Sequence, residues 1–401
     1  MDFPKFGVKK GLLMKDVRSR IGNYGTVNDA FPGGILADEI LTPGEKQIKA
    51  LFVSGGNPLI TMSDSEKLKS AFNKLDLLVC LDIQLNETCS EADYVLPCTD
   101  PFQRPDLPFV FPLMLGLQIK PYLQATDAVV PPQGEQRDEA SIYVELAKAS
   151  GFPLWGSKAG QKFFESLLRF NKLENGQRAL PQRSMLNVLL KLCRQPGFKK
   201  LLKNPHGILT RDHEEHDFLS KRVYTADRKV NLAPEAFLNT GKNLRQLFEK
   251  ELQPKDSFKL IIKRSVRTHN SWTHNTDRML KGTGNTNYAY LHPEDAARLK
   301  LKEGELADVS TEYGKIRIPV KFSDTLMPGS VAIPHGWGHQ HAKGLHVANK
   351  TKGVNVNILA GSGNGTIDPL SGMSRLTALD ITIETANGPM ANTWSGLPEE
   401  E

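Results

Sequence analysis

The densest run of residues able to do chemistry is RSVRTHNSWTHN, residues 264–275, which directly follows the apolar run Phe258 to Ile262. Its arginines offer charge-assisted donors, its asparagines pair a donor with an acceptor, and Trp272 offers a stacking face. Such a set suits a phosphorylated heterocycle, because phosphate needs cationic donors and a ring needs polar contacts at its edge. An ordinary polar loop is the alternative for this stretch taken alone.

A second polar cluster lies in residues 50–97, whose pattern predicts alternating strand and helix. The run from Lys49 to Ser54 predicts a strand, and Ser63 and Asp64 are typical caps of the helix that follows. The nearly continuous apolar run Leu75 to Ile83 predicts a buried strand. Since a helical crossover connects the two strands, we expect them to be parallel.

Ligands gather at the carboxyl ends of parallel strands, which here are Gly55 to Asn57 and Asp82 to Thr88. The glycines would let backbone N–H groups approach phosphate, and Asp82 can accept hydrogen bonds from a guanine edge or ribose hydroxyls. The segment taken alone also fits a plain turn at GGNP with Asp82 merely ending its strand, so both interpretations stay open.

Residues 155–255 carry a helical pattern interrupted by four prolines, which predicts a linker of packed helices. Within it, the sequence HEEH places His213 and His216 three residues apart, on one face of a helix. A solvated helix is favoured over a metal site there, because no third ligand is evident nearby.

From Phe258 onward the pattern changes to short strands, glycine turns and one brief helix. Asn287 to Leu291 predicts a strand, and Glu294 to Leu299 predicts a helix that starts near Pro293. The segment LKEGELADVSTEYGKIRIPVKFSD alternates as paired strands do, and SVAIP and LDITIE add further strands. These elements together predict a small closed barrel.

The order of several motifs along nearly the whole chain resembles the molybdopterin oxidoreductase family of the dimethyl sulfoxide reductase type. The motifs are RIGNYG, GGILADEI, LFVSGGNPL, LDIQLNETCSEADYVLP, FQRPD, PPQGEQRDEASIYVELA, RTHNSW, PHGWGH, VNVNIL and DPLSG. The resemblance implies an α/β fold in which a partial parallel-sheet, Rossmann-like domain precedes a C-terminal double-psi β-barrel. It suggests a partial oxidoreductase domain over residues 1–175, a helical linker over 176–256, a dinucleotide-binding barrel over 257–387 and a tail over 388–401.

Family members hold molybdenum or tungsten through two pterin guanine dinucleotides, and the resemblance carries cofactor contacts onto this chain. Gln103 stands where the family usually has glutamate, and Ala140 where it usually has an aromatic residue. The implied contacts are Gly56, Asn57, Asp82, Arg104, Glu139, Arg264, Arg267, Thr268, His269, Asn270, Ser271, His335 and Asn357.

Complete family members also have an N-terminal domain that often holds an iron–sulfur cluster, and they supply a protein ligand to the metal. The four cysteines here, at positions 80, 89, 98 and 193, show no CxxC spacing, so we expect no cluster in this chain. His335, His339, His341 and His346 are packed with glycine, which favours a loop around a cofactor over a metal site. We therefore expect no metal ligand here and assign no catalytic residue, although His269, His274 and His335 could line a substrate funnel.

Three functional hypotheses follow. The first is the C-terminal part of a molybdenum or tungsten oxidoreductase, which performs two-electron redox chemistry or oxygen-atom transfer together with an N-terminal half or a partner subunit that carries the metal ligand. The second is a noncatalytic cofactor-binding module or a truncated relic. The third, a nicotinamide-dependent dehydrogenase, is weak because no GxGxxG opens a helix after a strand.

Composition excludes several other classes of protein. A net charge of +6, from 51 basic and 45 acidic residues spread along the chain, does not argue for nucleic-acid binding. The longest apolar runs are too short to insert in a membrane, and the N-terminus has no signal-peptide core. Few cysteines in a long chain fit a reducing compartment, so we expect a cytoplasmic protein whose thiols pack in the core. We also expect it to self-associate when made alone.

Overall fold

The computed structural model of the protein describes residues 17–26, 30–108, 122–209, 223, 225, 227–253 and 256–386. The HEEH motif and the predicted tail, residues 388–401, lie outside these residues. The described residues divide into two compact units: a helical unit within residues 96–232, and a barrel unit within residues 17–95 and 233–386. We placed the predicted boundaries at 175 and 256, where the sequence pattern changes. The boundaries between the two compact units lie near residues 95 and 232 instead.

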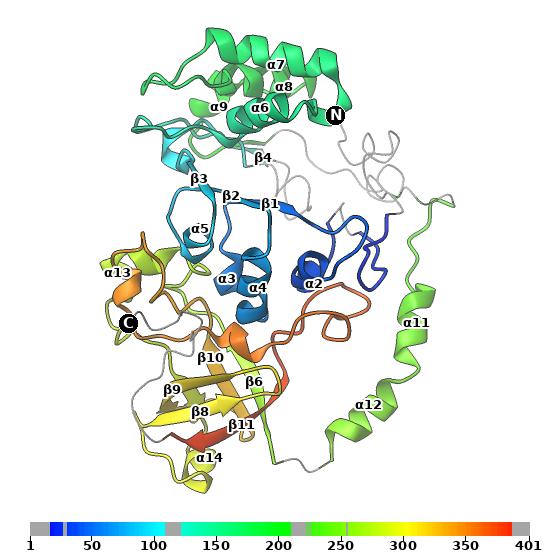
Figure 1. The fold of residues 1–401 in the computed structure, drawn as a ribbon, viewed down its shortest axis with the longest axis vertical. Helices are drawn as coiled ribbons and strands as arrows, with labels where there is room; N and C mark the ends of the chain where they lie inside the picture. The colour runs from blue at the N-terminus through cyan, green and yellow to red at the C-terminus, as the bar shows by residue number, and fades with distance from the viewer. Residues whose placement is uncertain are drawn as a thin grey trace. The chain divides into compact units, whose positions relative to one another are not determined.

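The barrel unit contains the predicted parallel strands. Strand β1 (Ala50–Ser54) pairs in parallel with β2 (Leu77–Asp82), and β3 (Tyr94–Pro97) follows in the order β1-β2-β3. Helices α2 (Leu36–Leu41), α3 (Pro58–Thr61) and α4 (Ser65–Phe72) lie on one side of β1 and β2 (Figure 1). Asp64 caps α4 by accepting the Lys67 N–H at 3.3 Å, which confirms the predicted cap.

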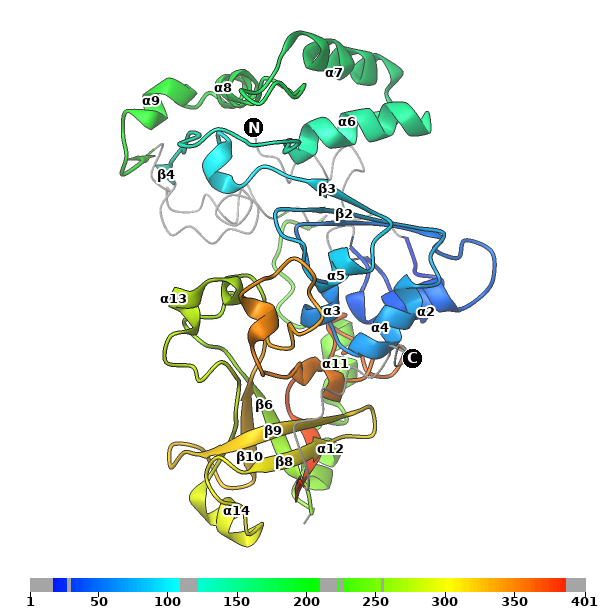
Figure 2. The ribbon, with the colours of Figure 1, turned by 60° about the vertical axis from the view of Figure 1, so that its left-hand side comes forward.

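The predicted closed barrel is confirmed. Six strands close in the order β10-β6-β11-β8-β9-β7, with β10 parallel to β6 and β7 parallel to β9 (Figure 2). Side chains of Leu260, Val309, Ile316 and Val331 are fully buried inside it. The double-psi assignment stays a prediction. The strands are β6 (Phe258–Lys263), β7 (Ala289–Leu291), β8 (Leu306–Ser310), β9 (Lys315–Phe322), β10 (Ser330–Pro334) and β11 (Leu379–Thr385), with α14 (Pro293–Arg298) between β7 and β8.

The helical pattern of residues 155–255 divides between the two units. In the helical unit, α6 (Glu139–Ser150) packs with α7 (Lys158–Phe170), and α8 (Gln182–Leu192) packs with α9 (Phe198–Leu202). In the barrel unit, α11 (Glu235–Gly241) and α12 (Leu244–Glu251) precede β6. The remaining elements are short: η1 (Gly33–Ile35), α5 (Glu87–Ser90), η2 (Pro101–Gln103), β4 (Tyr122–Leu123), η4 (Leu154–Gly156), β5 (Ile208–Leu209), η5 (Thr273–Asn275), α13 (Asp277–Leu280), η6 (Ala348–Lys350) and η7 (Val356–Leu359).

Two asparagines join the sheet to the barrel within the barrel unit. The Asn355 amide donates to the carbonyl of Leu59 at 3.1 Å, and the Asn357 amide donates to the carbonyl of Ile60 at 2.9 Å. Both asparagines are buried, and hydrogen bonds are electrostatically stronger in a buried region of low dielectric than in water. The two bonds hold α3, the helix that follows β1, against the barrel loops.

Two further observations bear on earlier predictions. All four cysteines are free thiols, and Cys80, Cys89 and Cys98 are buried, as expected for core residues. Among the helices that the structure describes, none is long and apolar enough to cross a membrane.

Acid stability of the barrel depends on Asp308, which links β8 to β9. Hydrogen bonds from Arg317, at 2.7 Å, and then from Lys315 lower the pKa of Asp308 from 3.8 to about 2. A depressed pKa stabilises the folded state above pH 3.8, and this stabilisation is lost as the pH falls toward 2. We expect Asp308→Asn to lower the melting temperature at pH 7 and to flatten its decline between about pH 4 and 2. Thermal unfolding across this range, with exposed Asp324→Asn as control, checks this; parallel curves for wild type and Asp308→Asn would contradict it.

Candidate cofactor-binding site

A cavity of about 360 Å³ lies in the barrel unit, where the end of β1 meets loops of the barrel. Seven residues predicted to contact the cofactor line it: Gly56, Asn57, Arg264, Asn270, Ser271, His335 and Asn357. Gly55, Thr61, Ile262, Trp272 and Leu376 complete the wall. The structure thus brings together polar segments that are up to 300 residues apart, which only the resemblance had assigned to contacts with one cofactor.

The Gly55–Asn57 loop lines this cavity and has backbone N–H groups left without a partner among the residues that the structure describes. Gly55 leaves the sheet with a left-handed backbone, φ 59°, after donating to the carbonyl of Leu81 at 2.8 Å. The N–H groups of Gly56 and Asn57 make no hydrogen bond within the described residues. Two adjacent free N–H groups on a cavity wall favour an anionic ligand.

The Asn57 side chain itself is fully engaged within the protein. Its amide group donates to Glu87 Oε2 at 2.6 Å and to Ser271 Oγ at 3.3 Å. Its carbonyl oxygen accepts from the Thr88 hydroxyl at 2.9 Å. This side chain is buried, so it shapes the loop, and the part of Asn57 left for a ligand is its backbone N–H.

Arg264 supplies the positive charge of the cavity wall. Its guanidinium donates to His335 Nε2, so this ring nitrogen must be an acceptor and the ring neutral. Burial, followed by the charge of Arg264, lowers the pKa of His335, which agrees with a neutral ring. His335 therefore orients the guanidinium without neutralising it, and the charge stays available to an anion.

The loop that contains Asn270, a residue of the cavity wall, approaches the loop at Gly336 closely. Asn270 has a left-handed backbone, φ 51°, and its carbonyl oxygen lies against Gly336, which has φ 86°. A Cβ atom at Gly336 would lie 2.0 Å from that oxygen. Glycine is therefore required at 336 by both its backbone angle and the space available.

Other predicted contacts in the same unit do not line this cavity. Arg267 and His269 belong to the loop after β6, and the exposed His269 uses its N–H to bond the Thr273 hydroxyl at 3.2 Å. Thr268 is buried and bonds to His274, as described below. Asp82 accepts from the N–H groups of Ile83 and Gln84 at 2.7 and 3.0 Å, which makes it the closing residue of its strand. Its proposed contact with guanine stays a prediction.

Arg104 and Glu139 lie in the helical unit, where they pair with each other. Arg104 Nη1 is 3.4 Å from Glu139 Oε2, and both side chains are partly exposed. Gln103, at the departure from the family pattern, closes a capping box with Asp100 at η2 and donates to Gln136 at 2.8 Å. Their roles toward a cofactor stay predictions.

Three buried histidines considered as metal ligands or funnel residues are engaged in hydrogen bonds with other side chains. His335 bonds Arg264, His339 bonds Glu87, and His274 is 1% exposed with both ring nitrogens hydrogen-bonded. Within the ranges that the structure describes, no three histidine, cysteine or acidic side chains cluster as metal ligands would. Since His274 has no open face, the structure offers it no place in a funnel wall.

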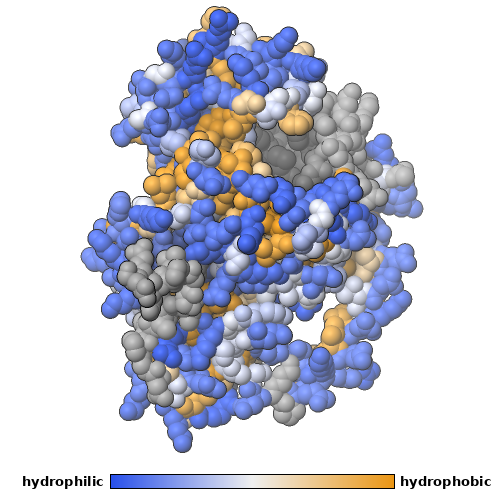
Figure 3. Space-filling view, in the orientation of Figure 1, coloured by the Kyte–Doolittle hydropathy of each residue, from blue (hydrophilic) through white to orange (hydrophobic). Residues whose placement is uncertain are grey.

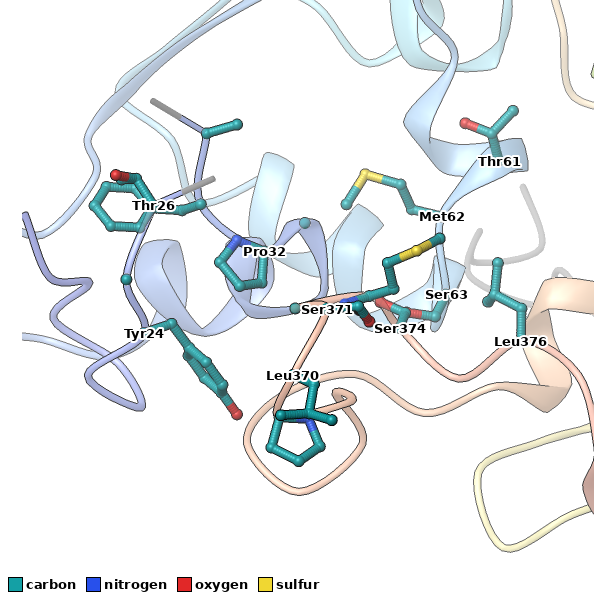
Figure 4. Close-up of a pocket in the computed structure, with 17 residues that line it drawn as sticks. Tyr24, Thr26, Pro32, Thr61, Met62, Ser63, Leu370, Ser371, Ser374 and Leu376 are labelled. Carbon is teal, nitrogen blue, oxygen red and sulfur yellow. Dashed lines mark hydrogen bonds between the residues drawn. The ribbon is translucent and has the colours of Figure 1, made fainter. Parts of the chain in front are cut away.

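A second cavity, of about 490 Å³, adjoins the first, because Thr61 and Leu376 line both. Figure 4 shows its wall, where Tyr24, Met62, Ser63 and Leu370 surround the space. No side chain among the described residues of this wall carries a formal charge. It therefore differs in character from the cavity that holds Arg264.

Comparison with protein families shows which family the two sides of this cavity resemble. A family described as Molydopterin dinucleotide binding domain matches residues 258–379, and one described as Molybdopterin oxidoreductase matches residues 15–149. The chain belongs to the molybdopterin oxidoreductase family. The first match covers β6 to the start of β11, and the second covers the sheet, so both sides of the cavity lie in matched segments.

Relatives in this molybdopterin family are distant and longer. The chain is 25% identical to trimethylamine-N-oxide reductase of Haemophilus influenzae, over 78% of this chain and 40% of that one. It is 23% identical to dimethyl sulfoxide/trimethylamine N-oxide reductase of Cereibacter sphaeroides, over 92% and 45% of the two chains. It corresponds to the C-terminal region of such reductases. The solved structure of acetylene hydratase from Pelobacter acetylenicus shares the fold, with a TM-score of 0.63, 20% identity and coverage of 88% and 46%.

Proposed function

We propose that this chain binds a pterin guanine dinucleotide of a molybdenum or tungsten cofactor, as the C-terminal part of an oxidoreductase. The observation that carries the proposal is that Arg264 lines the same cavity as Gly56 and Asn57, whose N–H groups make no hydrogen bond within the described residues. A cation beside paired backbone donors suits the pyrophosphate that joins the two halves of such a dinucleotide.

The rest of the wall fits the uncharged parts of the same ligand. Asn270 and Ser271 offer groups that can bond a polar ring edge, and Trp272, 38% exposed, offers a face for stacking. The two adjoining cavities together provide more room than a pyrophosphate needs. When bound, the metal and its pterins would supply two-electron redox chemistry or oxygen-atom transfer. The residues of this chain would bind the dinucleotide, orient it and neutralise its charge.

The remainder of the active centre is proposed to come from elsewhere. The chain spans 40% and 45% of the two reductases compared above, so the protein ligand of the metal would reside on another segment of the polypeptide or on a partner subunit. The buried free thiols support a reducing, cytoplasmic location for this assembly. Relatives also include an acetylene hydratase, so membership of the family does not by itself define the reaction.

Calorimetric titration tests dinucleotide binding directly. GDP carries the guanine and the diphosphate, pyrophosphate carries the charge alone, and guanosine carries neither phosphate. We expect the 401-residue chain to bind GDP and pyrophosphate, with affinities that fall as the salt concentration rises. Equal weak binding of all three probes, insensitive to salt, would contradict an anion site at Arg264.

Exposed apolar side chains on α12 and α11 are expected to drive self-association of the isolated chain. Leu244, Leu247 and Phe248 are each more than half exposed. In Figure 3 a small apolar patch lies among hydrophilic side chains on the segment that carries these helices. Leu247→Glu should lower the average mass measured by static light scattering, because it breaks the apolar stripe. Gln246→Glu adds the same charge on the same helix and should leave the mass unchanged. A wild-type chain that is monomeric at all concentrations would count against both this expectation and the proposed partner.

A further inference from the structure

A chain of buried hydrogen bonds runs beside the cofactor cavity and is not part of its wall. His339 Nδ1 lies 2.8 Å from Glu87 Oε1, and His339 Nε2 lies 3.1 Å from His274 Nδ1. His274 Nε2 in turn lies 3.1 Å from the Thr268 hydroxyl. Glu87, His339 and His274 are 1%, 0% and 1% exposed, so water does not compete for these bonds.

The acceptors around His339 define its protonation. Its Nε2 also lies 2.8 Å from the carbonyl oxygen of Gly336, which can only accept, so this nitrogen carries a hydrogen. With Glu87 ionised, Nδ1 carries a hydrogen as well, and the two side chains form a buried ion pair. His274 Nδ1 then accepts from His339 Nε2. Burial, and then the neighbouring charge of His339, lowers the pKa of His274 to about 3, so that ring is neutral.

Each end of the ion pair holds a loop of the cavity wall. The second carboxylate oxygen of Glu87 accepts from the Asn57 amide at 2.6 Å, which orients the loop with the free N–H groups. His339 holds the carbonyl of Gly336, the residue next to His335, which orients Arg264. The pair therefore connects the backbone donors and the cationic donor, which are the two parts of the proposed pyrophosphate site.

We propose that Glu87 and His339 are positioning residues that set the spacing between the N–H groups of Gly56 and Asn57 and the guanidinium of Arg264. This inference rests on the proposed function. Neither side chain lines the cavity, so they act through Asn57 and Gly336 rather than by contact with the ligand. A buried ion pair adds little net stability, because removing both charges from water offsets their attraction. It does define geometry, because each buried charge requires its partner at hydrogen-bond distance.

Substitution of Glu87 tests the proposal with the whole chain and GDP as the probe. Glu87→Leu removes the shorter of the two hydrogen bonds of the Asn57 amide and leaves His339 Nδ1 without an acceptor. We expect the affinity for GDP to fall about 10–100-fold, as for other residues that orient a ligand-binding group. Glu87→Gln can accept from Asn57 and donate to a neutral His339, whose Nε2–H still bonds Gly336. This conservative variant should recover most of the affinity.

A stability control separates positioning from general destabilisation. Ile316→Ala creates a cavity in the barrel core, away from the site, and should lower the melting temperature without changing the affinity for GDP. Wild-type affinity in Glu87→Leu, or the same loss of affinity in Ile316→Ala, would overturn the proposal. Failure of the wild-type chain to bind GDP would instead overturn the proposed function.

A second measurement needs no variant, in case Glu87→Leu does not fold. In the ¹⁵N-histidine-labelled wild-type chain, His339 should give two slowly exchanging ring N–H resonances, as an imidazolium shielded from water does. Saturation with GDP should shift both, because the ligand contacts groups that the ion pair holds. Ring resonances of His339 that do not move on saturation would overturn the proposal.

Discussion

Gly336→Ala is expected to cause the largest loss, lowering the free energy of unfolding by about 3 kcal/mol or more and removing measurable affinity for GDP. The alanine Cβ would lie 2.0 Å from the carbonyl oxygen of Asn270, which is backbone and cannot rotate away. The loop must therefore move. Because Asn270 lines the cavity and His335 is the neighbour of Gly336, movement displaces both the wall and the support of Arg264. Chemical denaturation and calorimetry with GDP measure the two effects.

Gly329 provides a matched control for this substitution. Its backbone is also left-handed, φ 80°, yet no atom lies within 4 Å of a Cβ built there. Gly329→Ala should thus cost only about 1–2 kcal/mol from its backbone angle and leave the affinity for GDP unchanged. If the two variants proved equally mild and both bound GDP normally, the close approach of the loops would have no functional importance.

Arg264→Ala is expected to weaken binding of GDP and pyrophosphate by a similar factor. A charge-assisted hydrogen bond contributes about 1.5–3 kcal/mol, which corresponds to about ten- to a hundredfold in affinity. Guanosine has no phosphate, so its affinity should change much less. The melting temperature should stay close to that of the wild type, because Arg264 is exposed and its hydrogen-bond acceptor, His335, is neutral. Calorimetric titration of each variant with the three probes gives the comparison.

Two variants make this prediction specific to the guanidinium at 264. Arg264→Lys keeps the charge but loses the forked donors, so its affinity should lie between those of wild type and Arg264→Ala. Arg245→Ala removes an exposed arginine from α12, where it pairs with Glu249, and should have no effect on binding. An equal loss in Arg245→Ala would mean that overall charge, and not this site, governs the affinity.

Local signals in the sequence were sufficient to predict most elements of the barrel unit. The apolar runs predicted β1 and β2. Asp64 predicted the start of α4, because a capping carboxylate bonds a backbone N–H only three residues away. Alternation gave the pairing of β8 with β9 around Tyr313 and Gly314. Barrel closure also followed from the set of strands, although the parallel pairing of β10 with β6 joins residues about 70 positions apart.

Hydrogen bonds between side chains far apart in the chain could not be predicted from the sequence. Asn57 was predicted as a contact from its motif, but its amide bonds Glu87 and Ser271, which only the folded chain brings near. Glu87 and His339 are separated by 252 positions, so no spacing rule could pair them. The available signal was that each lies in a family motif, Glu87 in ETCSEADYVLP and His339 at the end of PHGWGH, which marks the two segments without showing that they contact each other.

The most direct test of the central claim is to measure the metal and guanine-nucleotide content of the tagged chain purified from its native host, with mass spectrometry of the polypeptides that accompany it. The account predicts molybdenum or tungsten together with guanine nucleotide released by acid, and a segment or partner that carries the metal ligand. Turnover by that assembly would separate the oxidoreductase from a noncatalytic binding module. A folded chain recovered with neither metal nor guanine nucleotide would contradict the proposed function.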